Sequence, residues 1–137
     1  FNPSKNGSIY VYDCFTVGCI YIIRNRLREA FPYFKEAAMK GNKPEAWHNL
    51  GYICSKKGIP GADRQTSFPY FMKAANLGYV PSMYEVGCIY ISKMMYNEGM
   101  PWVEKAAAMG YEPAVKNLKK FKAGRAAHNN SILDYFG

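Results

Sequence analysis

Few side chains in this sequence are of the types that carry catalysis. The 137 residues include two histidines and four cysteines. His48 beside a thiol such as Cys19 or Cys88 could form a base and nucleophile pair, but a histidine that simply varies on a helix surface is the commoner case. Hydrolase, metalloprotease, P-loop and dinucleotide-binding motifs are all missing. We therefore predict no catalytic residues and expect a protein that is not an enzyme.

The four cysteines do not form a metal-binding pattern. They stand at positions 14, 19, 54 and 88, and no CxxC pair occurs among them. A zinc site needs Cys or His ligands clustered in pairs at short spacing. We expect no metal and no cofactor. An even number of cysteines would permit two disulfides, but the spacing shows no framework, and we predict four free thiols that behave as small apolar side chains.

A set of aromatic and polar residues is the better candidate for a functional surface. They occupy corresponding positions in successive repeats, yet their types differ, so they are free to serve binding. The first position holds Phe15, His48, Tyr84 and Lys116, the second Cys19, Tyr52, Cys88 and Lys120, and the third Ile22, Ser55, Ile91 and Ala123. The predicted partner-binding residues are Phe15, His48, Tyr52, Tyr84, Lys116 and Lys120. These three positions form one stripe along each first helix, and we call them the stripe. Simple packing of the stripe against neighbouring helices is an equal alternative.

The charge of the chain favours an acidic partner. Lys and Arg number 18 against 10 Asp and Glu, which gives a net charge of +8, and 16% of the residues are aromatic. Such a surplus attracts anionic surfaces in general. Basic residues crowd the C-terminal part, at Lys116, Lys119, Lys120, Lys122 and Arg125. They could bind nucleic acid through phosphate contacts and base stacking, or they could make a solubilising cap on a terminal repeat.

These residues are positioned by an internal repeat. The segment 31–41 recurs at 68–78 and at 100–110, each time with a proline at its second position, a pair of alanines and a final glycine. A second block, Val17 to Ile22, returns letter for letter as Val86 to Ile91, and residues 50–55 form a related copy. The copies of the first segment follow one another at intervals of 37 and 32 residues. Alternating helical blocks of this period are typical of repeats that stack on their neighbours.

Each block predicts one helix. The apolar spacing and the glycine stops place helices near 8–24, 28–40, 44–57, 67–77, 81–96, 100–109 and 113–122. The prolines at 32, 69 and 101 should begin or kink the second helix of each pair. Gly18, Gly51 and Gly87, inside the first helices, indicate close approach of the alanine pair on the partner helix. Ser131 is a candidate cap for a separate short helix in the C-terminal tail.

The prediction is a single all-α domain over residues 1–137, a right-handed α-solenoid of antiparallel helix pairs. Its repeats cover about 8–41, 44–78 and 81–110, followed by a C-terminal cap at about 113–137. The pattern Ala46-x-x-x-Leu50-Gly51, an aromatic such as Tyr90, and then Ala-Ala-x-x-Gly resembles the Sel-one-like repeat, a branch of the tetratricopeptide-like (TPR-like) solenoids. The resemblance covers roughly residues 13–122. Arg24, Lys57 and Lys93 depart from it, since they stand where the family has a glycine.

The resemblance implies adaptor or scaffold work. We expect a protein-interaction module that binds a partner protein, with an acidic surface, on its concave face. Bacterial members also include host-interaction factors and immunity proteins that neutralise secreted toxins, and a small basic solenoid suits the latter role. A nucleic-acid-binding module is the alternative from another class. No apolar run reaches the length of a membrane span. The sequence does not define the compartment: a soluble protein of the bacterial cytoplasm, or of the periplasm if a leader has been removed, fits it equally.

Overall fold

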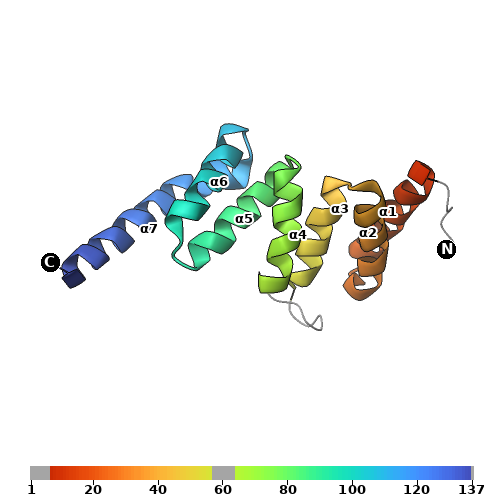
Figure 1. The fold of residues 1–137 in the computed structure, drawn as a ribbon, viewed down its shortest axis with the longest axis horizontal. Helices are drawn as coiled ribbons and strands as arrows, with labels where there is room; N and C mark the ends of the chain where they lie inside the picture. The colour runs from red at the N-terminus through yellow and green to blue at the C-terminus, as the bar shows by residue number, and fades with distance from the viewer. Residues whose placement is uncertain (1–6, 57–63, 137) are drawn as a thin grey trace. The chain divides into compact units, whose positions relative to one another are not determined.

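The structure, a computed structural model, describes residues 7–56 and 64–136, and these ranges contain only helices and turns. The described residues form seven helices, which follow one another in chain order (Figure 1). They are α1 (Gly7–Ile23), α2 (Leu27–Gly41), α3 (Pro44–Cys54), α4 (Arg64–Asn76), α5 (Val80–Ser92), α6 (Tyr96–Ala108) and α7 (Glu112–Phe136). The predicted all-α class is confirmed.

The chain forms two compact units. The first, unit 1, covers Phe1–Tyr79, and the second, unit 2, covers Val80–Gly137. In unit 1, α1 packs on α2, α2 packs on α3, and α3 packs on α4. In unit 2, α5 packs on α6, and α7 packs mainly on α6. The helix pairs α1/α2, α3/α4 and α5/α6 are the predicted antiparallel hairpins (Figure 1).

Several predicted helix ends were wrong. The helices α4 and α6 begin three and four residues before the predicted starts at 67 and 100, so that Pro69 and Pro101 lie inside them. Pro32 likewise lies inside α2. Each proline is the sixth residue of its helix, and the absent N–H removes one backbone hydrogen bond. A fully buried residue lies one or two positions before each proline, namely Ala30, Ser67 and Met100, and this packing favours continuing the helix past the defect.

The C-terminal tail also differs from the prediction. The last helix was expected to end near Lys122, with Ser131 capping a separate short helix. Instead α7 continues to Phe136, and Ser131 lies within it. No glycine or proline follows Gly124 until the end of the chain, so nothing local stops the helix. The sequence also predicts a loop at 58–65, of which residues 58–63 lie outside the described residues, whereas Arg64 and Gln65 belong to α4.

Left-handed residues end the helices, though not always where glycine was expected. Gly78 and Gly110 have φ of 92° and 82°, as predicted. In the first repeat the left-handed residue is Asn42, with φ of 50°, and Gly41 stays helical. At the hairpin turns, Asn25 and Met94 take φ of 57° and 62°. An asparagine tolerates this conformation, whereas a methionine pays a steric cost for it.

The glycines inside the first helices face large side chains. A Cβ atom added at Gly51 would lie 2.7 Å from the ring of Phe71, and one at Gly87 would lie 2.6 Å from Val103 Cγ2. Gly18 faces Phe34 in the same way. The expected close approach is therefore present, but these glycines meet the residue two after each proline and not the alanine pair. The alanine pairs of α2 and α4 are themselves buried.

Ile20, Ile53 and Ile89 stand at one corresponding position of the repeats, and the sequence predicts that all three are core residues, but their burial differs. Ile53 and Ile89 are buried, whereas Ile20 is 44% exposed. Ile53 belongs to a core cluster that includes Ala38 and Phe34 of the preceding α2. Within the described residues no hairpin precedes α1, so the same position of α1 lacks this neighbour.

Candidate partner-binding surface

Phe15 lies between the core and a lysine. Its ring meets the buried Phe34 edge-on, with centroids 5.6 Å apart. The ammonium of Lys43 lies 4.9 Å from the centroid of the Phe15 ring, within the range of a cation–π interaction. Lys43 also sits 3.9 Å from Glu45. Burial raises the pKa of the neighbouring Cys19 thiol, and Lys43 opposes that rise. The α1 end of the stripe is thus half-buried and positively charged.

His48 is packed among aromatic rings. Its imidazole centroid lies 5.2 Å from the ring of Phe71 and 5.1 Å from the ring of Tyr79. Burial lowers the pKa of His48 to about 4, so the imidazole is neutral at physiological pH. No thiol contributes to this shift. The geometry gives His48 the role of a neutral packing residue at the edge of α3.

Tyr52 is the accessible aromatic residue of the stripe in unit 1. Its side chain is 37% exposed. The ammonium of Lys56 lies 4.5 Å from its ring centroid, and Ser55 donates a hydrogen bond of 2.6 Å to the Tyr52 carbonyl. The Tyr52 ring therefore offers apolar area next to a cation, a combination that suits a partner carrying carboxylates.

Tyr84 has structural contacts within unit 2. Asn117 of α7 donates a hydrogen bond of 2.9 Å to its hydroxyl oxygen. The Tyr84 ring also lies 5.7 Å from Tyr111 and 6.5 Å from Phe121. Burial and a hydrogen bond with Cys88 raise the pKa of Tyr84 to about 12. Tyr84 thus links α5 to α7.

The two predicted lysines lie in the first half of α7 and are exposed. Lys116 borders a shallow depression, together with Glu112, Pro113 and Asn117. Asn117 also bonds Tyr84, so Lys116 and Tyr84 belong to one region of unit 2. The six predicted residues therefore divide between the units: Phe15, His48 and Tyr52 lie in unit 1, and Tyr84, Lys116 and Lys120 lie in unit 2.

A second aromatic group in unit 1 escaped the sequence reasoning. Trp47 stacks on Tyr70 with centroids 6.1 Å apart, and Phe31 meets Tyr70 edge-on at 6.4 Å. The ammonium of Lys73 lies 5.9 Å from the Trp47 ring centroid. We call these four residues the outer aromatic surface. The signal in the sequence was Trp47 itself, because Cys14 and Met83 stand at the corresponding positions of α1 and α5.

The described part of the chain offers little else for chemistry. All four cysteines are free thiols. No group of three or more His, Cys, Asp or Glu side chains among the described residues is arranged to hold a metal ion. None of the helices in the described ranges is long and apolar enough to cross a bilayer.

Comparison with known proteins identifies the fold class. No family model matches the sequence, and no curated protein matches it. Among solved structures, the crystal structure of MamA, a TPR-like helical repeat protein, matches with a TM-score of 0.67 and 17% sequence identity. The match covers 89% of this chain and 72% of the MamA chain. The chain thus has a TPR-like helical repeat fold, while the narrower Sel-one-like family is not confirmed.

Proposed function

We propose that this protein is an interaction module that binds a partner protein with an acidic surface. The observation that carries the proposal is the exposed Tyr52 ring with the Lys56 ammonium 4.5 Å from its centroid. A rigid aromatic side chain beside a cation is a frequent anchor in protein interfaces. The TPR-like fold supports the same conclusion, because stacked helix pairs present extended surfaces that bind other proteins.

In this proposal the residues of the stripe contribute unequally to the binding of the partner. Tyr52 supplies the anchor, while Phe15 and His48 shape the surface around it from half-buried positions. In unit 2, Lys116 and Lys120 are exposed and steer an acidic partner. Tyr84 holds these lysines in place through Asn117. A toxin neutralised by this protein would be one partner of the proposed kind, and the sign of its surface charge would test that narrower hypothesis.

Site-specific cross-linking tests the proposal. A photoreactive amino acid at position 52 should form an adduct with a discrete protein in a lysate of the source cells, whereas one at the exposed Glu104 should not. The partner is then purified, and Tyr52→Ala should weaken its binding about tenfold. The control Glu104→Ala should bind like the wild type. Equal binding by Tyr52→Ala and the wild type would contradict the proposal.

Nucleic-acid binding is the second candidate function, and α7 carries it. Lys116, Lys119, Lys120 and Lys122 are all exposed along this helix. Phosphate contacts from these lysines would make binding fall steeply with salt. A photoreactive amino acid at the exposed position 119 of α7, followed by nuclease treatment of the cross-linked lysate, separates the two candidates. An adduct that disappears with nuclease favours nucleic acid, and one that persists favours a protein partner.

A further inference from the structure

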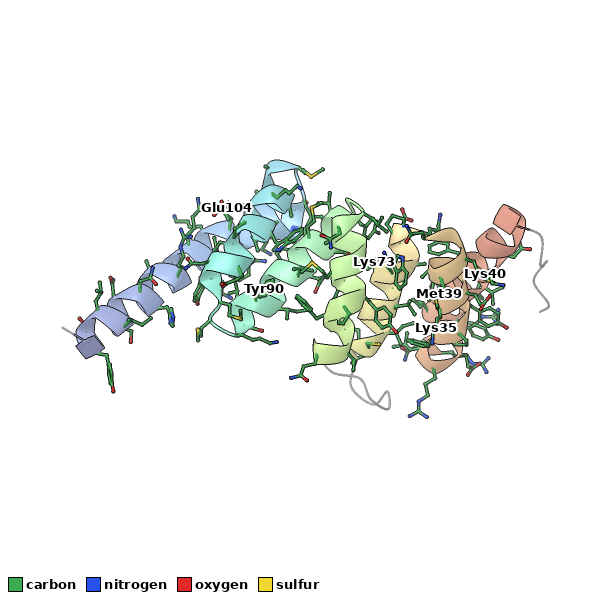
Figure 2. The ribbon with its side chains drawn as sticks, viewed as in Figure 1. Lys35, Met39, Lys40, Lys73, Tyr90 and Glu104 are labelled. Carbon is green, nitrogen blue, oxygen red and sulfur yellow. The ribbon has the colours of Figure 1, made fainter. Side chains whose placement is uncertain are left out.

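The outer aromatic surface continues along two helices of unit 1. On α2, Phe31, Lys35 and Met39 follow at intervals of four residues and therefore share one side of the helix. Tyr70 and Lys73 on α4, followed by Leu77 in the turn just after the helix, repeat the order of ring, lysine and apolar residue. The Phe31–Tyr70 contact joins the two rows. Figure 2 labels Lys35, Met39 and Lys73 on the side of unit 1 turned to the viewer.

The apolar members of these rows are unusually exposed. Met39 is 67% exposed and Leu77 is 39% exposed. Trp47, between the rows, is half-buried, and its indole N–H already donates a hydrogen bond of 3.0 Å to the Asn42 side chain. A ligand on this surface can therefore cover the Trp47 ring without having to supply a hydrogen-bond acceptor. Exposed methionine beside aromatic rings is typical of surfaces that bind peptides.

The charges around the rings indicate the sign of the ligand. Unit 1 contains eleven basic and five acidic residues, so it holds six of the eight surplus positive charges. The helix α4 contains no acidic residue that could neutralise Lys73. The described ion pairs of unit 1 join Arg26 to Glu29, Lys40 to Glu36 and Lys43 to Glu45, which leaves Lys35 and Lys73 outside them.

We propose that the outer aromatic surface, with Lys35 and Met39 beside it, is a second docking site that binds an acidic peptide segment of a partner protein. Carboxylates of the segment pair with Lys35 and Lys73, and an apolar side chain between those carboxylates covers Trp47. Tyr70 and Lys73 already lie against the Trp47 ring. They leave part of the Trp47 side chain exposed, and the exposed Met39 and Leu77 of the two rows suit an apolar side chain of a peptide better than a nucleotide. The site is distinct from the Tyr52 surface.

Trp47 provides its own reporter for a test. The chain has two tryptophans, Trp47 and Trp102, so Trp102→Phe leaves Trp47 as the sole indole. The probe is a short labelled peptide in which glutamates flank one phenylalanine, and the matched probe has glutamines in place of the glutamates. In Trp102→Phe, the acidic probe should shift Trp47 emission in a saturable way, and the glutamine probe should not.

Charge reversal supplies the decisive comparison. In the same background, Lys73→Glu should weaken binding of the acidic probe at least tenfold. Lys105 occupies the corresponding position of α6 after Trp102, but the buried Met83 stands there in place of Trp47. Lys105→Glu changes the net charge equally and should alter binding less than twofold. Trp47→Met, which copies Met83, should retain cooperative unfolding and lose binding as measured by anisotropy of the probe.

Three results would overturn the proposal. The first is a Trp47 emission that does not respond to the acidic probe. The second is an equal loss of binding in Lys73→Glu and Lys105→Glu, which would show attraction to net charge alone. The third is a single-stranded oligonucleotide that displaces the probe and binds more tightly, which would assign the surface to nucleic acid. Lys73 is exposed, so its variant answers the question even if Trp47→Met fails to fold.

Discussion

The strain and the burial of individual residues in this fold cannot be read from the repeat pattern. Met94 and Asn25 occupy the same turn position in two hairpins, and both have positive φ. His48 and Tyr84 occupy the same helical position in α3 and α5, and each is surrounded by rings. Substitutions at these positions isolate one physical effect each.

Replacing Met94 with glycine should stabilise the protein. A bulky residue in the left-handed region costs about 1–2 kcal/mol, which exceeds the entropy that glycine adds to the unfolded chain. The Met94 side chain is 58% exposed, so little apolar burial is lost. We expect Met94→Gly to raise the free energy of unfolding by about 1 kcal/mol in urea titrations. Met94→Asn, which copies Asn25, should give a smaller gain, and a loss in both variants would contradict the expectation.

His48 should make the protein sensitive to acid. Its pKa falls from 6.5 in the unfolded chain to about 4 in the fold. Above pH 6.5 both states hold neutral His48, and stability is intact. As the pH falls below 6.5 the unfolded state binds a proton that the folded state excludes, so stability declines until the pH reaches about 4. The total loss is about 3 kcal/mol.

Unfolding in urea at neutral pH and at pH near 4.5 measures this loss. His48→Tyr places the residue of the corresponding α5 position in the same aromatic surroundings. It should remove that part of the acid sensitivity and leave the contribution of the carboxylates. An unchanged dependence on pH in His48→Tyr would show that His48 titrates normally in the fold.

At the scale of the elements, glycine sets how closely the two helices of a hairpin pack. Gly51 meets the ring of Phe71, and Gly87 meets Val103 and the backbone of Gly99. At the corresponding position of α7 stands Lys119, which is exposed. That lysine makes α7 unsuited to the same close packing.

Gly51→Ala should destabilise the protein even though alanine favours the helix. The added Cβ would lie 2.7 Å from Phe71, a ring buried in the core. Overpacking costs about 1–3 kcal/mol, which outweighs a gain in helix propensity of about 1 kcal/mol. We expect a lower thermal midpoint, partly restored by adding Phe71→Leu. Lys119→Ala should change stability by less than about 0.5 kcal/mol. A stabilised Gly51→Ala would show that α3 and α4 can separate freely.

Tyr52 and Tyr84 should differ in what they do for stability. Tyr84→Ala removes a ring packed on Tyr111 and one of the two acceptors of the Asn117 side-chain amide, and we expect a loss of about 3 kcal/mol. Ile53→Ala, in the core, should cost a similar amount. Tyr52→Ala should cost less than about 1 kcal/mol, because the ring is exposed. Thermal unfolding of the three variants measures these losses of stability. A Tyr52→Ala variant as unstable as Ile53→Ala would place Tyr52 in the core.

For the whole molecule, charge is the property most relevant to binding. Six of the eight surplus positive charges belong to unit 1, which also contains Tyr52 and the outer aromatic surface. An acidic partner should therefore be attracted before it makes close contact.

Salt should slow association with the partner more than it speeds dissociation. Screening shortens the range of exposed charges from about 10 Å at 0.1 M salt to about 3 Å at 1 M. We expect the association rate, measured by stopped flow, to fall about tenfold over this range while the dissociation rate changes less than threefold. Lys56→Glu should lower the association rate at low salt and lose most of that effect at high salt. An association rate that does not change with salt concentration would argue against an acidic partner.

The sequence by itself determined the fold class and most of the helices. Period, alanine pairs and glycine stops are local signals, and α1, α2 and α3 begin within one residue of their predicted starts. Helix ends that depend on burial were missed, as at α4, α6 and α7. At these ends the helix is extended by burial against residues distant in sequence, or it continues because no stop signal follows. A local pattern does not contain the burial information.

Only the tertiary structure decided which stripe residues are accessible. Tyr52 and Tyr84 look alike in the sequence, yet one is exposed beside Lys56 and the other is tied to Asn117. Lys73 and Trp47 are separated by 26 positions and meet because α3 and α4 form a hairpin. The position of a residue in the repeat determines on which side of its own helix the side chain lies. What covers that side chain depends on packing between helices, and this packing placed Trp47 against Tyr70 and Lys73.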